Sequence, residues 1–461
     1  MKPWHTAFLY SSMIAATVAG FFAVSFLGRD LVAPEPMRVP GMGRAAPPSS
    51  AETLLHVLLA MAIIIAVARI LGNVFRRFKQ PPVIGEVVAG ILLGPSLLGM
   101  VAPRLSGYLL PPDVAPILGV IAQVGVILYM FIVGIELDTQ QLRHRTHVSI
   151  AISHASIITP FLLGSSLALF LYRDLATSAV PFPLFALFMG VSMSVTAFPV
   201  LARILTDRGI HMSRMGVIAL ACAAVDDVTA WCLLALVVSV AHARPEGVFL
   251  TVALSLGFIA VMLLAVRPLI IRFVRYYEQG GLSGQGMMAV ACMGMLLCAI
   301  ATESIGIHAL FGAFLLGSLI PHDSKAARDL RERLEDIVIV LFLPVFFAFT
   351  GMRTQIGLLN GVNEWILCGA IIVVASIGKF GGSFIAARLS GLSWRQSASL
   401  GILLNTRGLI ELIVLNVGLD LGVLSPKLFA MMVLMAVVTT IATTPILELM
   451  NPKEVFDDRQ Q

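Results

Sequence analysis

Apolar runs about as long as a lipid bilayer is thick follow one another through this sequence. A transmembrane helix needs about 20 consecutive apolar residues. Runs this long and uniform exclude the alternating strands of a membrane β-barrel. Because lipid offers no hydrogen-bond partners, the backbone groups of each run must pair within a helix. The sequence therefore predicts an all-α, polytopic membrane protein. The thirteen expected spans are 52–72, 82–100, 115–137, 148–172, 181–203, 214–241, 247–271, 285–302, 304–321, 336–352, 364–388, 396–420 and 427–449.

The composition excludes soluble classes of protein. Hydrophobic residues make up 58% of the chain and charged residues 12%, against about 45–50% and about 25% in soluble domains. A net charge of +5 on such a chain indicates topology rather than nucleic-acid binding, so we expect no nucleic acid among its partners. The five cysteines stand singly in apolar stretches, which predicts neither a disulfide framework nor a zinc site.

The basic residues predict an orientation in the membrane. If the loop that holds Arg76, Arg77 and Lys79 is cytoplasmic, its alternate loops hold most of the remaining Lys and Arg. Cytoplasmic loops carry such an excess, so we expect an odd number of spans in an inner (plasma) membrane. The short tail 451–461 is then cytoplasmic. We expect no regulatory nucleotide-binding domain after it.

Residues 1–50 are set apart by an apolar run from Thr6 to Leu27 and a linker rich in Pro and Gly. Such a segment is either a signal peptide or an additional anchor. No convincing small-residue cleavage site follows at once. We therefore expect an extra N-terminal helix before the membrane domain, which spans residues 51–450.

A short internal repeat relates two spans. Residues 89–94 (AGILLG) in the second span resemble residues 312–317 (GAFLLG) in the ninth. The odd offset would place the two copies in opposite orientations, which is typical of inverted-repeat transporters. Ordinary helix packing also produces small-residue patterns, so the match alone leaves both interpretations open.

Two adjacent carboxylates, Asp226 and Asp227, lie in the middle of span 214–241. Each ionisable residue at mid-bilayer costs at least about 2.5–3.5 kcal/mol, so each requires a partner, a wet cavity or a function. Neighbours on a helix point about 100° apart, so one can face a cavity while the other meets a second helix. Lys379 in span 364–388 is the candidate counter-charge. The alternative to this pairing is that the long side chain of Lys379 reaches the membrane surface.

Two spans contain polar interruptions, at residues 192–199 in span 181–203 and at residues 405–411 in span 396–420. Interrupted helices at corresponding places in two halves indicate the binding site of a transporter. The alternative for the first is a simple proline kink. Arg407 and Glu411, four residues apart, indicate an internal and structural ion pair. The candidate residues in these interruptions are Ser194, Thr196, Pro199, Thr406, Arg407 and Glu411.

Four other ionisable residues are weaker candidates. Glu86 and Glu136 stand near the ends of spans, and we expect them at helix ends or the membrane surface rather than at an ion. His154 and His308 could sense pH, but a hydrogen-bonded packing role is the better interpretation.

Together these segments resemble the monovalent cation:proton antiporter-2 family, including its plant cation/proton-exchanger relatives. The resemblance covers residues 52–449 and rests on 85–96 (GEVVAGILLGPS), 134–138 (GIELD), 194–199 (SVTAFP), 225–227 (VDD), 378–379 (GK) and 405–412 (NTRGLIEL). It implies a homodimer in which a core (148–241 and 364–449) moves against a dimerisation scaffold (52–137 and 285–352). It further implies that Asp227 binds Na+ or K+, that Asp226 pairs with Lys379, and that Thr196 lies where broken helices cross.

The expected function is antiport by alternating access, which would serve cation and pH homeostasis. A proton and a Na+ or K+ ion compete for Asp227, and the proton gradient drives exchange, so we expect no cofactor and no enzymatic activity. Because Asp226 with Lys379 adds a second titrating unit, we expect two protons per cation, which is electrogenic. The alternative is a permanent Asp226–Lys379 brace and one proton per cation. Na+ and K+ both stay candidates, since selectivity depends on ligand number and cavity field.

Two rival functions belong to other classes. An intramembrane aspartyl protease needs two facing carboxylates, whereas Asp226 and Asp227 diverge on one helix. A sodium-coupled symporter of organic anions can share an inverted-repeat architecture, but the Asp pair with Lys379 argues against it.

Overall fold

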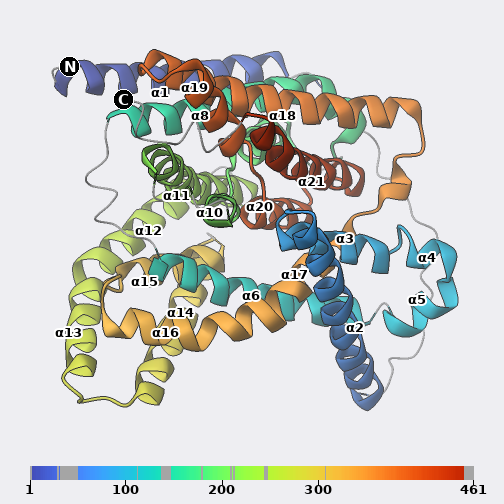
Figure 1. Cartoon of the computed structure of the whole chain (residues 1–461), viewed down its shortest axis with the longest axis vertical. Helices are drawn as coiled ribbons and strands as arrows, with labels where there is room; N and C mark the ends of the chain where they lie inside the picture. The colour runs from blue at the N-terminus through green and yellow to red at the C-terminus, as the bar shows by residue number, and fades with distance from the viewer. Residues whose placement is uncertain are drawn as a thin grey trace.

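The computed structural model describes residues 3–28, 31, 50–111, 113–136, 147–177, 180–207, 210, 213–242, 248–306 and 308–450, and every regular element within them is a helix (Figure 1). The α-helices are α1 (Pro3–Leu27), α2 (Ser50–Arg77), α3 (Pro82–Leu93), α4 (Leu98–Val101), α5 (Pro103–Leu109), α6 (Val114–Glu136), α8 (His147–Leu175), α9 (Phe182–Ser194), α10 (Phe198–Asp207), α11 (Arg214–His242), α12 (Val248–Val261), α13 (Arg267–Glu278), α14 (Gly284–Ile305), α15 (Ala309–Leu319), α16 (Lys325–Ile337), α17 (Leu343–Arg353), α18 (Val362–Leu389), α19 (Trp394–Leu404), α20 (Leu409–Asp420) and α21 (Pro426–Leu449). Two π-helical segments, η1 (Met262–Val266) and η2 (Val338–Phe342), and a 3-10 turn, η3 (Ile356–Leu358), complete the described part.

The predicted all-α membrane fold is confirmed. Among the described residues, ten helices are long and apolar enough to cross a membrane. They correspond to ten of the expected spans. The remaining three expected spans, 181–203, 304–321 and 396–420, contain the shorter helices α9 and α10, α15, and α19 and α20. The total of thirteen spans stays a prediction.

Two sets of three helices pack in the same pattern, and each set contributes one helix to the contacts of the other. Helix α3 packs on α2 and α17, and α15 packs in the same way on α14 and α6. Glycine makes both contacts close: a Cβ at Gly94 would lie 2.8 Å from the Met352 Cα of α17, and one at the matching Gly317 would lie 2.3 Å from the Phe131 carbonyl oxygen of α6. The repeat at residues 89–94 and 312–317 therefore lies at two equivalent helix contacts, as an inverted repeat requires.

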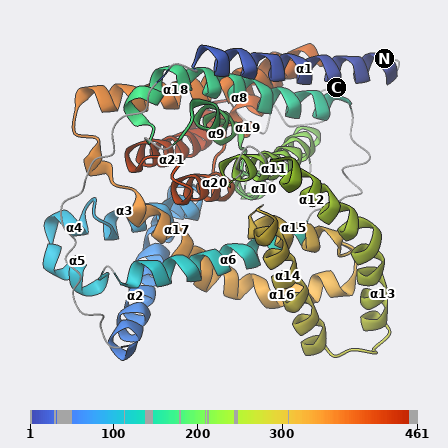
Figure 2. The same cartoon turned by 180° about the vertical axis from the view of Figure 1, so that it is seen from behind.

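A second group repeats in the same manner. Helix α8 packs on α18; α9 and α11 both pack on α8, as α19 and α21 pack on α18. Helices α8–α11 and α18–α21 gather in one half of the molecule, and α2–α6 and α12–α17 gather in the other (Figures 1 and 2). We call the first the core half and the second the scaffold half, after the ranges expected for each; α12 and α13 lie in neither expected range. That the two halves act as core and scaffold, and that one moves against the other, stays a prediction.

Polar contacts join the two halves at their edges. Arg353 of α17 donates to Asn416 (3.0 Å) and Asp420 (2.6 Å) of α20. After α2, Lys79 lies 3.4 Å from Glu448 of α21. Both contacts involve partly exposed side chains, so each contributes little to stability by itself.

The N-terminal segment forms the expected extra helix. Helix α1 packs on α8 and α9, and the rings of Phe21 and Phe161 lie 5.8 Å apart. That the segment is kept as an anchor rather than cleaved as a signal peptide stays a prediction, because both kinds of segment form a helix. The linker at 32–49 and the tail at 451–461 lie outside the described residues.

Several expected boundaries were wrong. The span expected to end at residue 72 continues to Arg77, so Arg76 and Arg77 lie on α2 rather than in a loop. The span expected to end at residue 271 continues through η1 and α13 to Glu278, so Arg267, Arg272 and Arg275 lie on a helix rather than in a loop. The charged stretch before residue 336 is also helical, as α16. Exposed basic side chains do not interrupt a helix, because they reach water while the backbone keeps its hydrogen bonds.

Candidate functional site

The two polar interruptions lie against each other at the centre of the core half. Between α9 and α10, residues 195–197 are not helical, and neither are residues 405–408 between α19 and α20. The Ala197 amide donates to the Thr406 carbonyl oxygen (3.1 Å). The Thr196 hydroxyl lies 3.3 Å from the Leu404 carbonyl oxygen. Both predicted interruptions are therefore present, and they meet as crossing breaks rather than as a lone proline kink.

Helix α11 brings Asp226 to this crossing. Its side chain is fully buried and takes hydrogen bonds from three different helices or breaks. The donors are Ser153 Oγ at 2.7 Å, Ser156 Oγ at 2.7 Å, Thr196 Oγ1 at 2.7 Å and Lys379 Nζ at 3.0 Å. Such a set of donors stabilises an ionised carboxylate.

Lys379 reaches the crossing from α18 with a fully buried side chain. Its ammonium group donates to the carbonyl oxygens of Ser156 (3.0 Å) and Ser194 (2.6 Å) as well as to Asp226. An ammonium has three N–H donors, and all three have acceptors here. The Asp226–Lys379 pair implied by the resemblance is thus present in the structure, and the alternative in which the lysine reaches the surface is wrong.

Asp227 faces a different environment from its neighbour. It is 4% exposed, and its Oδ1 has no hydrogen-bond partner in the described part of the chain. The carboxylate accepts a backbone hydrogen bond from Phe198, the first residue of α10. A helix N-terminus carries partial positive charge and favours an anion. Asp227 is therefore held at one side, while its Oδ1 is buried without a partner among the described residues.

Arg407 does more than the expected pairing with Glu411. Its guanidinium group donates to the carbonyl oxygens of Ser192 (3.1 Å), Met193 (2.8 Å) and Val195 (3.0 Å) at the end of α9. Glu411 is farther away, at 3.4 Å. The ion pair is present, but the arginine chiefly supplies donors to a helix end whose carbonyls would otherwise be unpaired.

The other candidates support the backbone of the crossing. The Thr406 hydroxyl donates to the Leu403 carbonyl oxygen (2.5 Å) at the end of α19, so its hydrogen is already used in a bond to the backbone. The Ser194 hydroxyl bonds Gly190 (2.7 Å), while its carbonyl accepts from Lys379. Pro199 is the second residue of α10, where a proline is tolerated because its missing N–H has no helical acceptor.

Two of the four weaker candidates make structural contacts at helix ends. Glu136 ends α6 and pairs with Arg331 (3.0 Å), as expected for a helix-end residue. His308 caps α15 through the Leu310 amide, which is a structural hydrogen bond. Glu86 is buried on α3, and His154 is half-buried on α8. Asp138 lies outside the described residues.

Three residues that contact this site were not predicted from the sequence. Ser153 and Ser156 donate to Asp226, and the Thr440 hydroxyl of α21 bonds the backbone of Arg407 in both directions (3.0 and 2.9 Å). The serines left a signal, because two hydroxyls three residues apart share one face of span 148–172. Thr440 left none, since threonine is common in membrane helices.

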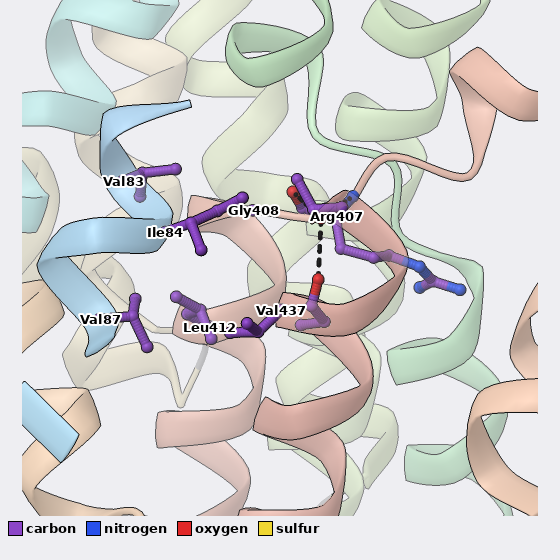
Figure 3. Close-up of a pocket in the computed structure, with 9 residues that line it drawn as sticks. Val83, Ile84, Val87, Arg407, Gly408, Leu412 and Val437 are labelled. Carbon is purple, nitrogen blue, oxygen red and sulfur yellow. Dashed lines mark hydrogen bonds between the residues drawn. The ribbon is translucent and has the colours of Figure 1, made fainter. Parts of the chain in front are cut away.

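A small apolar pocket lies beside the second break, between α3 and the helices α20 and α21. Val83, Ile84 and Val87 of α3 face Leu412 and Val437 across it (Figure 3). The backbone of Arg407 reaches the rim, but its guanidinium group points away from the pocket (Figure 3). Neither aspartate lines it, so the pocket belongs to the boundary between the two halves and not to the aspartate pair.

Most of this chain matches a known protein family. The model described as "Sodium/hydrogen exchanger, transmembrane" matches residues 62–449. The chain belongs to the sodium/hydrogen exchanger family. Within this family, the chain is 43% identical to the Na+/H+ antiporter NhaS4 of a Synechocystis species, over 87% of this chain and 98% of that protein.

Other members of the exchanger family are similar over most of this chain. Identity is 40% to cation/H+ antiporter 20 of Arabidopsis thaliana, covering 84% of this chain, and 32% to K+/H+ antiporter 1 of Saccharomyces cerevisiae, covering 89%. This chain spans 48% of each of those two proteins. The solved sodium/proton antiporter MjNhaP1 of Methanocaldococcus jannaschii shares the fold, with a TM-score of 0.61 at 13% identity over 88% of this chain and all of that one.

Proposed function

We propose that this protein exchanges a monovalent cation, Na+ or K+, for protons across a membrane by alternating access. The observation that carries the proposal is the contrast between the two adjacent aspartates. Asp226 is saturated with donors, whereas Asp227 has a buried Oδ1 with no partner in the described part of the chain. A buried carboxylate that lacks donors is a position for which a cation and a proton compete, since either one neutralises it.

The named relatives support this choice. NhaS4 is a Na+/H+ antiporter and the yeast protein a K+/H+ antiporter, so both cations are in the class of substrate. These relatives are transporters rather than enzymes. No relative named here is a symporter, which favours antiport over the organic-anion alternative.

Alternating access requires the two halves to move apart at one edge at a time. The contacts of Arg353 with α20 and of Lys79 with α21 lie at edges of that boundary, and we propose that each breaks in part of the cycle. We further propose a homodimer in an inner (plasma) membrane with a cytoplasmic C-terminus. The excess of Lys and Arg in alternate loops supports this orientation.

The decisive experiment replaces the Asp227 carboxylate with an amide. Asp227→Asn should abolish both cation and proton flux in proteoliposomes while the protein stays folded, because an amide cannot carry the charge that both ions neutralise. Glu364→Gln is the matched control. It removes another acid of the core half, one that pairs with Lys427 (3.3 Å) away from the crossing. Exchange that survives in Asp227→Asn would remove Asp227 from the ion-binding role.

We also propose that the exchange is electrogenic, with two protons for each cation. The support is a second titrating unit, the buried Asp226–Lys379 pair, next to Asp227. One net charge crossing about 100 mV is worth about 2.3 kcal/mol, which changes the cation gradient at zero net flux by roughly fifty-fold. The test sets a known potential at equal pH in proteoliposomes and finds that gradient. A reversal point that ignores the potential would establish one-to-one exchange.

A further inference from the structure

Ser153 and Ser156 of α8 place their hydroxyl groups around Asp226, and we call this pair the hydroxyl cradle. The proposed function assigns these two serines no role. Ser153 and Ser156 are both 0% exposed. Ser153 Oγ donates to one carboxylate oxygen and Ser156 Oγ to the other, each at 2.7 Å. They stand three residues apart, so both hydroxyls face α11 from one side of α8.

The cradle suits only one charge state of Asp226. An ionised carboxylate accepts at both oxygens, whereas a protonated one must itself donate. With Thr196 and Lys379 included, four donors converge on the two oxygens. Of the two serines, Ser156 has a second acceptor, the Ser153 carbonyl oxygen at 2.8 Å. Hydrogen bonds to a charged acceptor are about twice as strong, so the carboxylate holds both hydroxyl protons.

Asp227 has no such cradle. Its Oδ1 is without a partner among the described residues, although it is adjacent in sequence and similarly buried. The difference follows from helix geometry, because neighbouring side chains point about 100° apart and only Asp226 faces α8. The two carboxylates are therefore prepared for different tasks.

We propose that Ser153 and Ser156 are positioning residues of the exchange reaction: they hold Asp226 as an anion turned toward Lys379, and so leave Asp227 alone to exchange cation for proton. This inference rests on the proposed antiport. It adds that Asp226 keeps its negative charge through the cycle. Any second proton is then the one on Lys379.

Several charged groups surround this cradle. On its own helix Asp226 has Asp227 as neighbour, and from α18 it faces Lys379. Arg407 and Glu411 of the second break act electrostatically on Lys379. Helix α8 carries half-buried His154 next to the serines. The variants of the test leave all of these groups unchanged.

The test measures the pH profile of exchange for Ser153→Ala, Ser156→Ala and the double variant in proteoliposomes. Without the hydroxyls, protonation of Asp226 should become easier, which releases Lys379 and stops exchange at a higher pH. We expect the acid limb of the profile to move upward by about one pH unit in the double variant, with less in each single variant. The maximal rate at alkaline pH should stay near that of the wild type.

Matched variants separate this role from packing. Ser165→Ala removes another fully buried hydroxyl of α8, which bonds Ala186 (3.0 Å) and does not contact Asp226; its pH profile should be unchanged. Ser153→Thr keeps a hydroxyl and should restore most of the profile lost in Ser153→Ala. If the double variant does not fold, the single variants carry the test.

The outcomes distinguish the two proposals. A wild type that fails to exchange cations for protons overturns the proposed function itself. A wild type that exchanges, together with single and double alanine variants whose acid limb does not move, overturns only the positioning role of Ser153 and Ser156. An equal shift in Ser165→Ala overturns it as well, because the effect would then come from packing of α8.

Discussion

Arg407 tests how the first broken helix is held in place. Its guanidinium group supplies donors to the carbonyl oxygens of Ser192, Met193 and Val195, whereas Glu411 is a distant partner at 3.4 Å. We expect Arg407→Met to be strongly destabilising and Glu411→Gln to be nearly neutral. A pair that acted chiefly through charge would instead make the two substitutions similarly costly.

The size of the effect follows from three lost hydrogen bonds. Interhelical hydrogen bonds in a membrane average about 0.6 kcal/mol, and a buried acceptor left without any partner costs about 1–3 kcal/mol. Loss of three donors therefore predicts a cost of about 2 to 9 kcal/mol in Arg407→Met. Glu411→Gln removes one long contact, and its Oε1 already lacks a partner in the described part of the chain, so we expect about 1 kcal/mol or less.

The assay measures the melting temperature of each purified variant as it unfolds in detergent. Arg353→Met is the control, because it removes a partly exposed arginine (25% side-chain exposure) from the edge of the two halves. Arg407→Lys should lie between wild type and Arg407→Met, since an ammonium keeps the charge but not the planar fork. If Glu411→Gln melted as low as Arg407→Met, the ion pair rather than the helix-end contacts would stabilise the break.

Two further predictions concern single side chains. Thr196→Val should raise the apparent KM for the cation in transport assays more than Thr406→Val, because the Thr196 hydroxyl bonds Asp226 whereas the Thr406 hydroxyl bonds only the backbone of Leu403; equal KM values would mean that both only brace the backbone. Gly90→Ala should lower the yield of folded protein in detergent, since its Cβ would lie 2.1 Å from a backbone oxygen of α17, whereas Gly369→Ala meets nothing within 4 Å. Normal folding of Gly90→Ala would refute that close contact.

Much of the fold follows from the sequence. Lipid cannot satisfy backbone polar groups, so long apolar runs had to become helices. Ten of the expected spans correspond to long apolar helices in the described part of the chain, apart from boundaries such as that at Glu278. The interruptions at 195–197 and 405–408 were also readable. Their polar residues stand in apolar runs, where they are costly without a special role.

The candidate site was readable only as a set of residues. Asp226, Asp227 and Lys379 stand out because each charge in a membrane helix is rare and must be compensated. Their division of labour was not readable, since two adjacent aspartates look equivalent in a sequence. The structure distinguishes them through Ser153 and Ser156, which occupy one side of Asp226.

The sequence by itself determined which segments cross the membrane and which side chains need partners, because both depend on the local cost of placing polar groups in lipid. Only the tertiary structure decided which residues are the partners of these side chains. Arg407 meets carbonyl groups more than two hundred positions earlier in the chain, and Lys379 meets Ser194 across 185 positions. Helical periodicity orients a side chain within its own helix, but contacts between helices depend on how the two halves of the repeat pack.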